Sequence, residues 1–335
     1  MILLVLEGLI QHLFFKKYNL FISLFLVFIF LIILYGSVES YSYSRVTKDQ
    51  ETYTINQGDT INKIFNDVSL NFAEKAMIKL YLKFNNINII QAGHYDLVNK
   101  NWRTFIDNLS NGFIKEFLFQ IPEGSNLYDI KNIIENSYLE LDCPNFICLD
   151  KQFGFYEGTL MPDTYFYKFK SSLASILIQS QNDFFIYIRN LWLNRNLKNP
   201  LKNLSQAIIL ASIVEKEAGN DLEKPIIAGV FLHRININMK LQADPTIIYG
   251  LMPDFNGNIT KANINDKNNP YNTYQIMGLP PTPISTISKT SLEAVILGQP
   301  NEYLYFVAKG DGTHYFSKDY NEHLNSVKKY QLNKQ

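Results

Sequence analysis

Hydrophobic positions form one long run near the N-terminus, in which only Ser23 is polar. The run "LFISLFLVFIFLIIL" covers residues 20–34, and residues 20–38 carry no charge. As a helix this segment would extend roughly 28 Å, close to the thickness of a bilayer core. Lys16 and Lys17 precede it, which predicts a cytoplasmic segment at 1–19 and a body outside the cytoplasm. A cleaved signal peptide is the alternative, but the run is long for one and no good cleavage site follows it.

After a polar linker at 39–52, the pattern predicts a small βααβ domain at 53–115. Tyr53 and Ile55 alternate as in a strand, and Gly58-Asp59 indicates a turn, where Asp59 or Thr60 can cap a helix. A second helix is expected at 73–84, followed by a turn and a strand in "QAGHYDLVNKNW". This strand, Gly-Asp-Thr and helix pattern resembles LysM, a module that binds N-acetylglucosamine polymers. A packing domain without sugar affinity is the other interpretation.

The remaining segment, 116–335, mixes helical and strand patterns. Strands are expected at 117–121 and 303–308, with helices at 171–197, 204–218 and 221–235. The elements do not alternate regularly as strand and helix, and no Walker or Rossmann glycine pattern occurs. The class predicted for the whole chain is therefore α+β, with an N-terminal transmembrane helix, a small LysM-like domain and a larger mixed domain.

Composition narrows the partners and cofactors. The chain has 335 residues, 47% of them hydrophobic, and a formal net charge of zero, so nucleic acid is not expected as a partner. Cys143 and Cys148 lie five apart, and both a small-loop disulfide and two free thiols remain open. No metal-ligand spacing accompanies them, and His314 and His323 are not spaced as a metal pair. We therefore expect neither a metal nor another cofactor.

Two glutamates end the helix predicted at 204–218, in the motif "SIVEKEAGN". At 3.6 residues per turn, Glu215 and Glu217 point about 200° apart, so they cannot serve one site as a pair. Glu217 comes close to Asp221 and favours a face turned to solvent. Glu215 has small helical neighbours that leave room for a substrate: Ala211, Ser212, Ala218 and Gly219. Glu215 is the better candidate for a partly buried acid with a raised pKa.

Polar side chains suited to sugar hydroxyls and acetamides gather in two later motifs. The motifs are "MKLQADPTIIYG" and "NPYNTYQIMGLPPTPIS", and their candidate binding residues are Gln242, Asp244, Thr246, Tyr249, Asn272 and Tyr274. An ordinary turn and a rigid proline-rich brace are the alternatives. Glu157 and Asp163 are further candidates for a cleft. His314 and His323 are interpreted as structural.

Several long motifs, taken in order, resemble the endolytic murein transglycosylase family, also called MltG or YceG-like. They are "QAGHYDL", "PEGSNLYDI", "YEGTLMPDTYFY", "LASIVEKEAG", "AGVFLHRI", "MKLQADPTIIYG", "YNTYQIMGLPPTPIS", "YLYFVAKGDGTHYFS" and "NEHLNSV". The resemblance implies a single-pass protein of the cytoplasmic (inner) membrane, with a catalytic domain at 116–335 outside the cytoplasm. It also implies internal cleavage of peptidoglycan glycan strands that leaves 1,6-anhydro-N-acetylmuramic acid ends, which would terminate the growing strand. The catalytic glutamate that it implies is Glu215.

One strong acid suits a lytic reaction better than hydrolysis, which usually needs two carboxylates. Peptidoglycan glycan strands are the expected substrate, and peptidoglycan synthases are candidate partners. An anchored wall-binding scaffold without cleavage is the alternative from another class. A hydrolase of another polysaccharide is a third. Glycan chain length and oligomeric state are not readable from these patterns.

Overall fold

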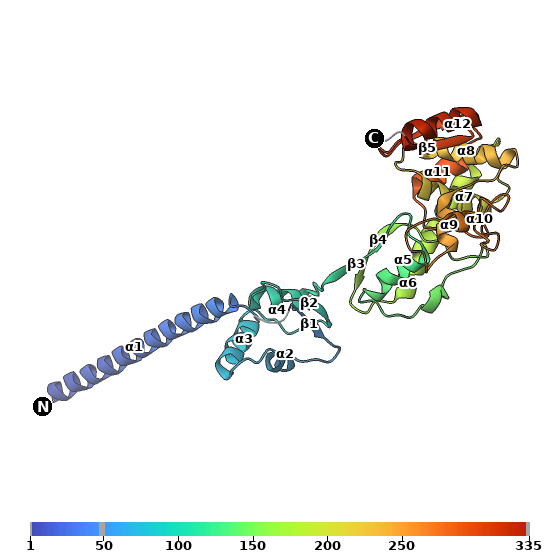
Figure 1. Cartoon of the computed structure of the whole chain (residues 1–335). Helices are drawn as coiled ribbons and strands as arrows, with labels where there is room; N and C mark the ends of the chain where they lie inside the picture. The colour runs from blue at the N-terminus through green and yellow to red at the C-terminus, as the bar shows by residue number, and fades with distance from the viewer. Residues whose placement is uncertain (1, 47–50, 333–335) are drawn as a thin grey trace. The chain divides into compact units, whose positions relative to one another are not determined.

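The structure is a computed structural model that describes residues 2–46 and 51–332, with side chains from residue 16 onward. The chain forms two compact units, Met1–Glu116 and Phe117–Gln335. The described residues form helices and short two-stranded sheets, in keeping with the predicted α+β class (Figure 1).

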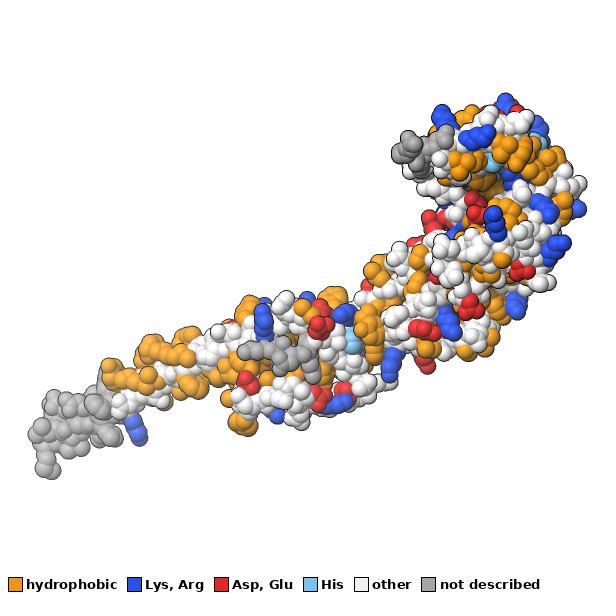
Figure 2. Space-filling model, viewed as in Figure 1, with side chains coloured by type: hydrophobic (Ala, Val, Ile, Leu, Met, Phe, Trp, Pro, Cys, Tyr) orange, Lys and Arg blue, Asp and Glu red, His pale blue; other side chains and the backbone are white. Residues whose placement is uncertain are grey.

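The first unit begins with one long helix, α1 (Ile2–Ser42). Its stretch Lys16–Ser42 is long and apolar enough to cross a membrane by length and composition. The side chains of residues 20–32 are exposed, and Figure 2 shows their hydrophobic groups along this part of the helix. Of the predicted cytoplasmic segment, the side chains of residues 1–15 lie outside the described part of the chain. The helix is compatible with a single-pass membrane anchor.

The helix α1 continues four residues past the predicted end of the span at Val38. Val38 and Ser42 are buried against the small domain, and Val46 is buried as well. Arg103 donates a hydrogen bond to Glu39 at 3.3 Å, which ties the helix to the domain again. The described part of the predicted linker, 39–46, is therefore packed structure, because its apolar side chains complete a core. Residues 47–50 lie outside the described residues.

The rest of the first unit has the predicted strand–helix–helix–strand order. Its elements are β1 (Thr52–Ile55), α2 (Ile61–Asp67), α3 (Phe72–Phe84), β2 (Gly93–Asp96) and α4 (Trp102–Asn111). The two strands are antiparallel, with Thr52 opposite Asp96. Of the two predicted caps, Thr60 is the one at the start of α2, where it accepts a hydrogen bond from the Lys63 amide. Trp102 and Phe105 are fully buried in the core of this unit.

The second unit is built mostly from helices, with two small sheets. Its strands are β3 (Glu116–Ile121), β4 (Asp163–Lys168), β5 (Tyr305–Ala308) and β6 (His314–Ser317). Its α-helices are α5 (Leu127–Glu135), α6 (Leu173–Leu193), α7 (Leu204–Glu217), α8 (Lys224–Asn236), α9 (Asp244–Gly250), α10 (Lys261–Asn265), α11 (Lys289–Ile296) and α12 (Tyr320–Val327). Strand β3 pairs with β4, and β5 pairs antiparallel with β6.

Helix α7 is the centre of this unit. Its residues 207–214 are all buried, and four helices contact it: α6, α8, α9 and α11. Such a helix has apolar side chains on every face because it is covered all round. Its first turn, 204–206, and its last turn are less enclosed, and the last turn carries Glu215 and Glu217.

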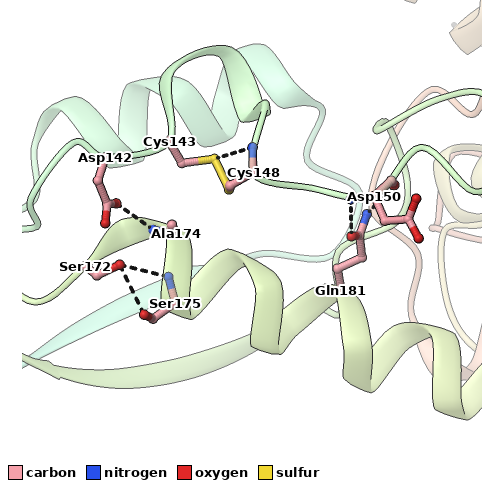
Figure 3. The surroundings of a disulfide bond; sticks show 8 residues. All are labelled: Asp142, Cys143, Cys148, Asp150, Ser172, Ala174, Ser175 and Gln181. Atoms are coloured by element: carbon pink, nitrogen blue, oxygen red, sulfur yellow. Dashed lines mark hydrogen bonds between the residues drawn. A yellow bond between two sulfur atoms is a disulfide. The ribbon is translucent and has the colours of Figure 1, made fainter.

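The cysteines form a disulfide, Cys143–Cys148, in the loop after α5 (Figure 3). Around it, Ala174 donates its amide hydrogen to Asp142 at 2.8 Å. The Gln181 side chain accepts a hydrogen bond from the Asp150 amide and donates one to the Asp150 carbonyl. The loop is thereby fastened to α6. The disulfide lies in a structural position, far in sequence from the glutamates of α7.

Candidate active site

The last turn of α7 is shaped by the residue that follows it. Ala218 adopts an extended conformation, so the helix stops at Glu217. At Gly219 a Cβ atom would lie 2.5 Å from the Gly312 carbonyl oxygen, closer than any side chain can come. The Asn220 side chain donates a hydrogen bond to the same oxygen at 3.1 Å. The turn between β5 and β6 is thus held directly against the end of α7.

Glu215 is enclosed by polar groups from α8 and from the start of α11. Its Oε2 accepts hydrogen bonds from the Ser288 amide at 3.1 Å, the Ser288 hydroxyl at 2.5 Å and the Ser291 hydroxyl at 2.6 Å. Lys224 Nζ lies 3.3 Å from the same oxygen, and both side chains are at least nine-tenths buried. Of the small neighbours expected around Glu215, Ala211 and Ser212 precede it on the helix, whereas Ala218 and Gly219 lie beyond the end of the helix. The contacts of Glu215 are those of an anchor between helices.

Glu217 points away from that network and lines a cavity of about 520 Å³. Polar and aromatic side chains from β5, β6, α8, α9 and α12 form the walls of this cavity, which we call the Glu217 pocket. The residues that line it are Glu217, Arg234, Gln242, Asp244, Tyr274, Tyr305, Phe306, Val307, Ala308, His314, Tyr320, His323, Val327 and Gln331. A cavity of this size and polarity can hold a sugar unit.

Burial and, next, the negative charge of Asp244 raise the pKa of Glu217 to about 8, while Arg234 opposes the shift. No hydrogen bond contributes to this pKa. A carboxyl group with these surroundings is protonated at neutral pH. It is therefore able to donate a proton to a substrate.

Three of the six predicted binding residues line the Glu217 pocket: Gln242, Asp244 and Tyr274. The Tyr274 hydroxyl donates a hydrogen bond to Asp244 at 2.8 Å. The pKa of Tyr274 is raised, chiefly by burial and next by this bond, so the tyrosine remains a donor. Asp244 opens α9, where Pro245 occupies the first turn, so this segment is a short helix and not the ordinary turn that was the alternative.

The other three predicted residues are occupied elsewhere in the fold. Thr246 is fully buried and bonds the Ala243 carbonyl. Asn272 is fully buried and donates to three backbone carbonyls in and after α10. Tyr249 donates its hydroxyl hydrogen to Glu157 at 2.8 Å. None of the three is among the residues that line the Glu217 pocket.

Glu157, a further cleft candidate, is a buried carboxyl. Its Oε2 accepts hydrogen bonds from Tyr249 and from the Leu127 amide at the start of α5. Among the described residues its Oε1 has no partner. Burial raises the pKa of Glu157 to about 7. The next residue, Gly158, has a positive φ, and a Cβ there would lie 2.6 Å from Pro283, so the proline-rich loop packs directly against this motif. Asp163 is exposed at the start of β4.

Most of the other residues that line the Glu217 pocket were not predicted as binding residues, and Arg234, Tyr305, His314 and His323 are among them. Arg234 is buried, donates to the carbonyls of Leu304 and Leu241, and lies over the Tyr305 ring. Arg234 belongs to the motif "AGVFLHRI", which is the feature of the sequence that could have identified it as a pocket residue. His314 and His323 are distant from Glu217 in the sequence, and only the fold brings them into the same pocket.

The two histidines of the pocket have different partners. His314 Nδ1 lies 2.8 Å from Glu223, and its amide also donates to Glu223. His323 stacks on Tyr305 with ring centroids 5.1 Å apart. Burial lowers the pKa of His323, and the charge of Arg234 lowers it as well. In the described part of the chain, no group of three or more His, Cys, Asp or Glu side chains is arranged to hold a metal ion.

Known proteins resemble this chain over most of its length. The endolytic murein transglycosylase of Bacillus subtilis (strain 168) is 31% identical over 323 residues, which cover 85% of this chain and 87% of that protein. The protein of the same name from Streptococcus pneumoniae (strain ATCC BAA-255 / R6) is 30% identical over 180 residues, 51% of this chain and 31% of that protein. A crystal structure of a yceG-like protein from Listeria monocytogenes is 28% identical, with a TM-score of 0.56 over 82% of this chain and 97% of that chain.

The sequence pattern of one protein family covers the part of the chain that holds the pocket. It matches residues 53–329, which include α2 to α12 and every residue named above as a wall of the Glu217 pocket except Gln331. The resemblance inferred from the sequence motifs is thereby confirmed. The chain belongs to the YceG-like family.

Proposed function

We propose that this protein is a membrane-anchored endolytic murein transglycosylase, which cleaves peptidoglycan glycan strands internally. The observation that supports the proposal best is the Glu217 pocket. There a carboxyl group with a pKa of about 8 meets an arginine, an aspartate and a tyrosine in a cavity of about 520 Å³. The names of the Bacillus and Streptococcus relatives agree with this activity.

In the proposed reaction Glu217 acts first as an acid and then as a base. The protonated carboxyl donates its hydrogen to the oxygen that joins muramyl C1 to the next glucosaminyl unit, and the C1–O bond breaks. The resulting carboxylate then takes the proton of the muramyl C6 hydroxyl, whose oxygen attacks C1. The product end is 1,6-anhydro-N-acetylmuramic acid, no water is consumed, and Glu217 returns to its protonated form.

The remaining polar groups of the pocket would bind and polarise the sugar. The negative charge of Asp244 is suited to stabilise the positive charge that develops at C1. Gln242 and Tyr274 would hold hydroxyl or acetamide groups, and Arg234 would hold the new carboxylate of Glu217. Thr246, Tyr249 and Asn272, which were also predicted to bind substrate, would act indirectly by fixing α9 and the loop that follows α10.

This proposal assigns the acid to Glu217 in place of Glu215. Glu215 Oε2 already accepts three hydrogen bonds and faces Lys224. A proton donor needs an accessible hydrogen and a site for the reacting oxygen beside it. Glu217 lines a cavity with three of the predicted sugar-binding residues, whereas Glu215 is not among the residues that line it.

The proposed place of action is the outer surface of the cytoplasmic membrane, with a single span in α1. The Lys16 and Lys17 pair before the apolar run supports a cytoplasmic N-terminus. At that surface the enzyme would end the elongation of nascent strands, and peptidoglycan synthases would be its partners. The strand–helix–helix–strand domain would contact glycan as LysM modules do.

The reaction is tested by the products of peptidoglycan digestion with the full-length protein in detergent. Asp244 is a second carboxylate in the pocket, so hydrolysis by an acid–base pair is the competing reaction. Mass spectrometry separates the two, because anhydro ends are lighter by one water than reducing ends. Anhydro ends support the lytic route. Reducing ends would replace it with hydrolysis, and binding without any cleavage would favour the scaffold alternative.

A further inference from the structure

We infer that the small domain of the first unit docks on the membrane that α1 spans, through the C-terminal end of α3. The inference rests on the proposed anchor and concerns a surface that the proposed reaction does not use. The docking surface consists of Lys79, Lys83, Phe84 and Ile89, and its partner is the outer lipid leaflet.

The direction of α3 follows from its contacts with α1. The ring of Phe84, at the end of α3, lies 5.6 Å from the ring of Tyr35. Met77, seven residues earlier, lines a groove with α1 residues up to Tyr41 and with Ser44 beyond the end of α1, and Glu74 interacts with Tyr41. Helix α3 therefore runs antiparallel to α1, and its C-terminal end is the end nearer the apolar run. Figure 1 shows α3 beside the last turns of α1.

The depth of Phe84 follows from the length of the apolar run. The first charge after residue 20 is Glu39, which pairs with Arg103 on the water side. A helix from residue 20 to Glu39 extends about 30 Å, the thickness of the hydrocarbon core. Tyr35 is one helical turn before Glu39, roughly 6 Å nearer the membrane centre. Phe84, whose ring contacts that of Tyr35, thus lies at the boundary of the hydrocarbon.

The side chains around Phe84 suit this boundary. Phe84 and Ile89 are 42% and 68% exposed, although both are large and apolar. Lys79 and Lys83 are exposed one turn apart on α3 and can meet lipid phosphates. Aromatic rings and lysines are the side chains typical of a membrane–water interface.

A groove between α1 and α3 gives a second reason for a lipid partner. The open groove has a volume of about 600 Å³ and is lined by Ile33, Gly36, Ser37, Ser40, Tyr41, Ser44 and Met77. One of its walls, Ile33, belongs to the apolar run, so the groove begins within the membrane-spanning stretch. An acyl chain could enter it from the bilayer beside Gly36, where no side chain stands in the way.

The inference is tested with fluorescent labels on the full-length protein in lipid nanodiscs. The described residues contain no free cysteine, so a new cysteine takes the label alone. An environment-sensitive label is attached in the variants F84C and I89C. The matched control is F72C, at the opposite end of the same helix and 89% exposed. F28C, in the middle of the apolar run, reports the anchor itself.

Docking predicts a blue-shifted emission at positions 84 and 89 and quenching there by lipids brominated near the headgroup. Position 72 should show neither effect, and position 28 should show a blue shift from its place in the bilayer. If position 28 is in lipid while 84 and 89 behave like 72, the docking inference is wrong and the anchor stands. If position 28 is in water, the anchor fails and the docking inference fails with it.

Discussion

The carboxyl of Glu217 sets the pH dependence that we expect of the reaction. Burial and the charge of Asp244 raise its pKa to about 8, and the free enzyme needs the protonated form. The value of kcat/KM should therefore fall as pH rises through about 8. Asp244→Asn removes the neighbouring charge and should move this decline to lower pH.

The pH profile of glycan cleavage, measured for both proteins, tests this expectation. Asp254→Asn is the control, because Asp254 is an exposed acid that follows α9 and is not among the residues that line the pocket. A decline that stays in place in the Asp244 variant would contradict the assigned role of its charge.

Glu157 should make the second unit less stable as pH rises. Its pKa in the folded state is about 7, above the ordinary value of 4.5, because burial disfavours its charged form. The stabilisation is thus fully present below 4.5 and is lost as pH rises through 7. The shift corresponds to at most about 3 kcal/mol.

Urea unfolding of the wild type and of Glu157→Gln, at pH 6 and at pH 8, measures this effect. The amide keeps an acceptor for Tyr249 and carries no charge, so the variant should lose less stability between the two pH values than the wild type. Equal losses in the two proteins would show that Glu157 does not titrate in this range.

At the scale of elements, Lys224 joins α7, α8 and α11. Its Nζ lies 3.3 Å from Glu215 and donates to Ser288 and Thr290 at the start of α11. Lys224→Met leaves the Glu215 carboxylate buried without its cation and should destabilise the unit by roughly 3–5 kcal/mol. The exposed Lys202→Met is the control and should change stability by less than about 0.5 kcal/mol. A similar small change at Lys224, measured by urea unfolding, would refute its anchoring role.

The sequence pattern was sufficient for most elements near α7. Apolar spacing predicted the helices at 171–197, 204–218 and 221–235, and α6, α7 and α8 match these ranges to within a few residues at each end. The pattern did not predict α9, because Asp-Pro is as common in turns as at the start of a helix. It also could not show that α7 ends at Glu217, since that end depends on the approach of Gly312 to Gly219.

The proposed choice between the two glutamates depends on contacts that the sequence pattern does not contain. The argument for Glu215 counted Ala218 and Gly219 as helical neighbours, but both lie beyond the end of the helix. The groups that surround Glu215 come from 224, 288 and 291, distant in sequence. Gln242, Asp244 and Tyr274 stay predicted binding residues, and short sequence motifs carry them. Their relation to Glu217 required the fold.

At the scale of the whole molecule, α1 belongs both to the predicted membrane span and to the core of the first unit. A shortened chain that starts at Tyr35 keeps Val38, which is 1% exposed, and a chain that starts at Tyr43 loses it. The loss of this one buried side chain is worth about 1.5–3 kcal/mol. The chain that starts at Tyr43 should therefore unfold at a lower temperature by calorimetry. Equal unfolding temperatures would restore the interpretation of 39–46 as a linker.

The chain as a whole is interpreted as an anchored enzyme whose chemistry depends on one carboxyl group. The most direct measurement compares peptidoglycan cleavage by the wild type, Glu217→Gln and Glu215→Gln, with urea unfolding of each protein. We predict that Glu217→Gln forms no anhydro ends while it keeps wild-type stability, because an amide replaces a neutral acid. Glu215→Gln should lose stability through its contact with Lys224 and still form anhydro ends. Anhydro ends from Glu217→Gln at the wild-type rate would contradict the account.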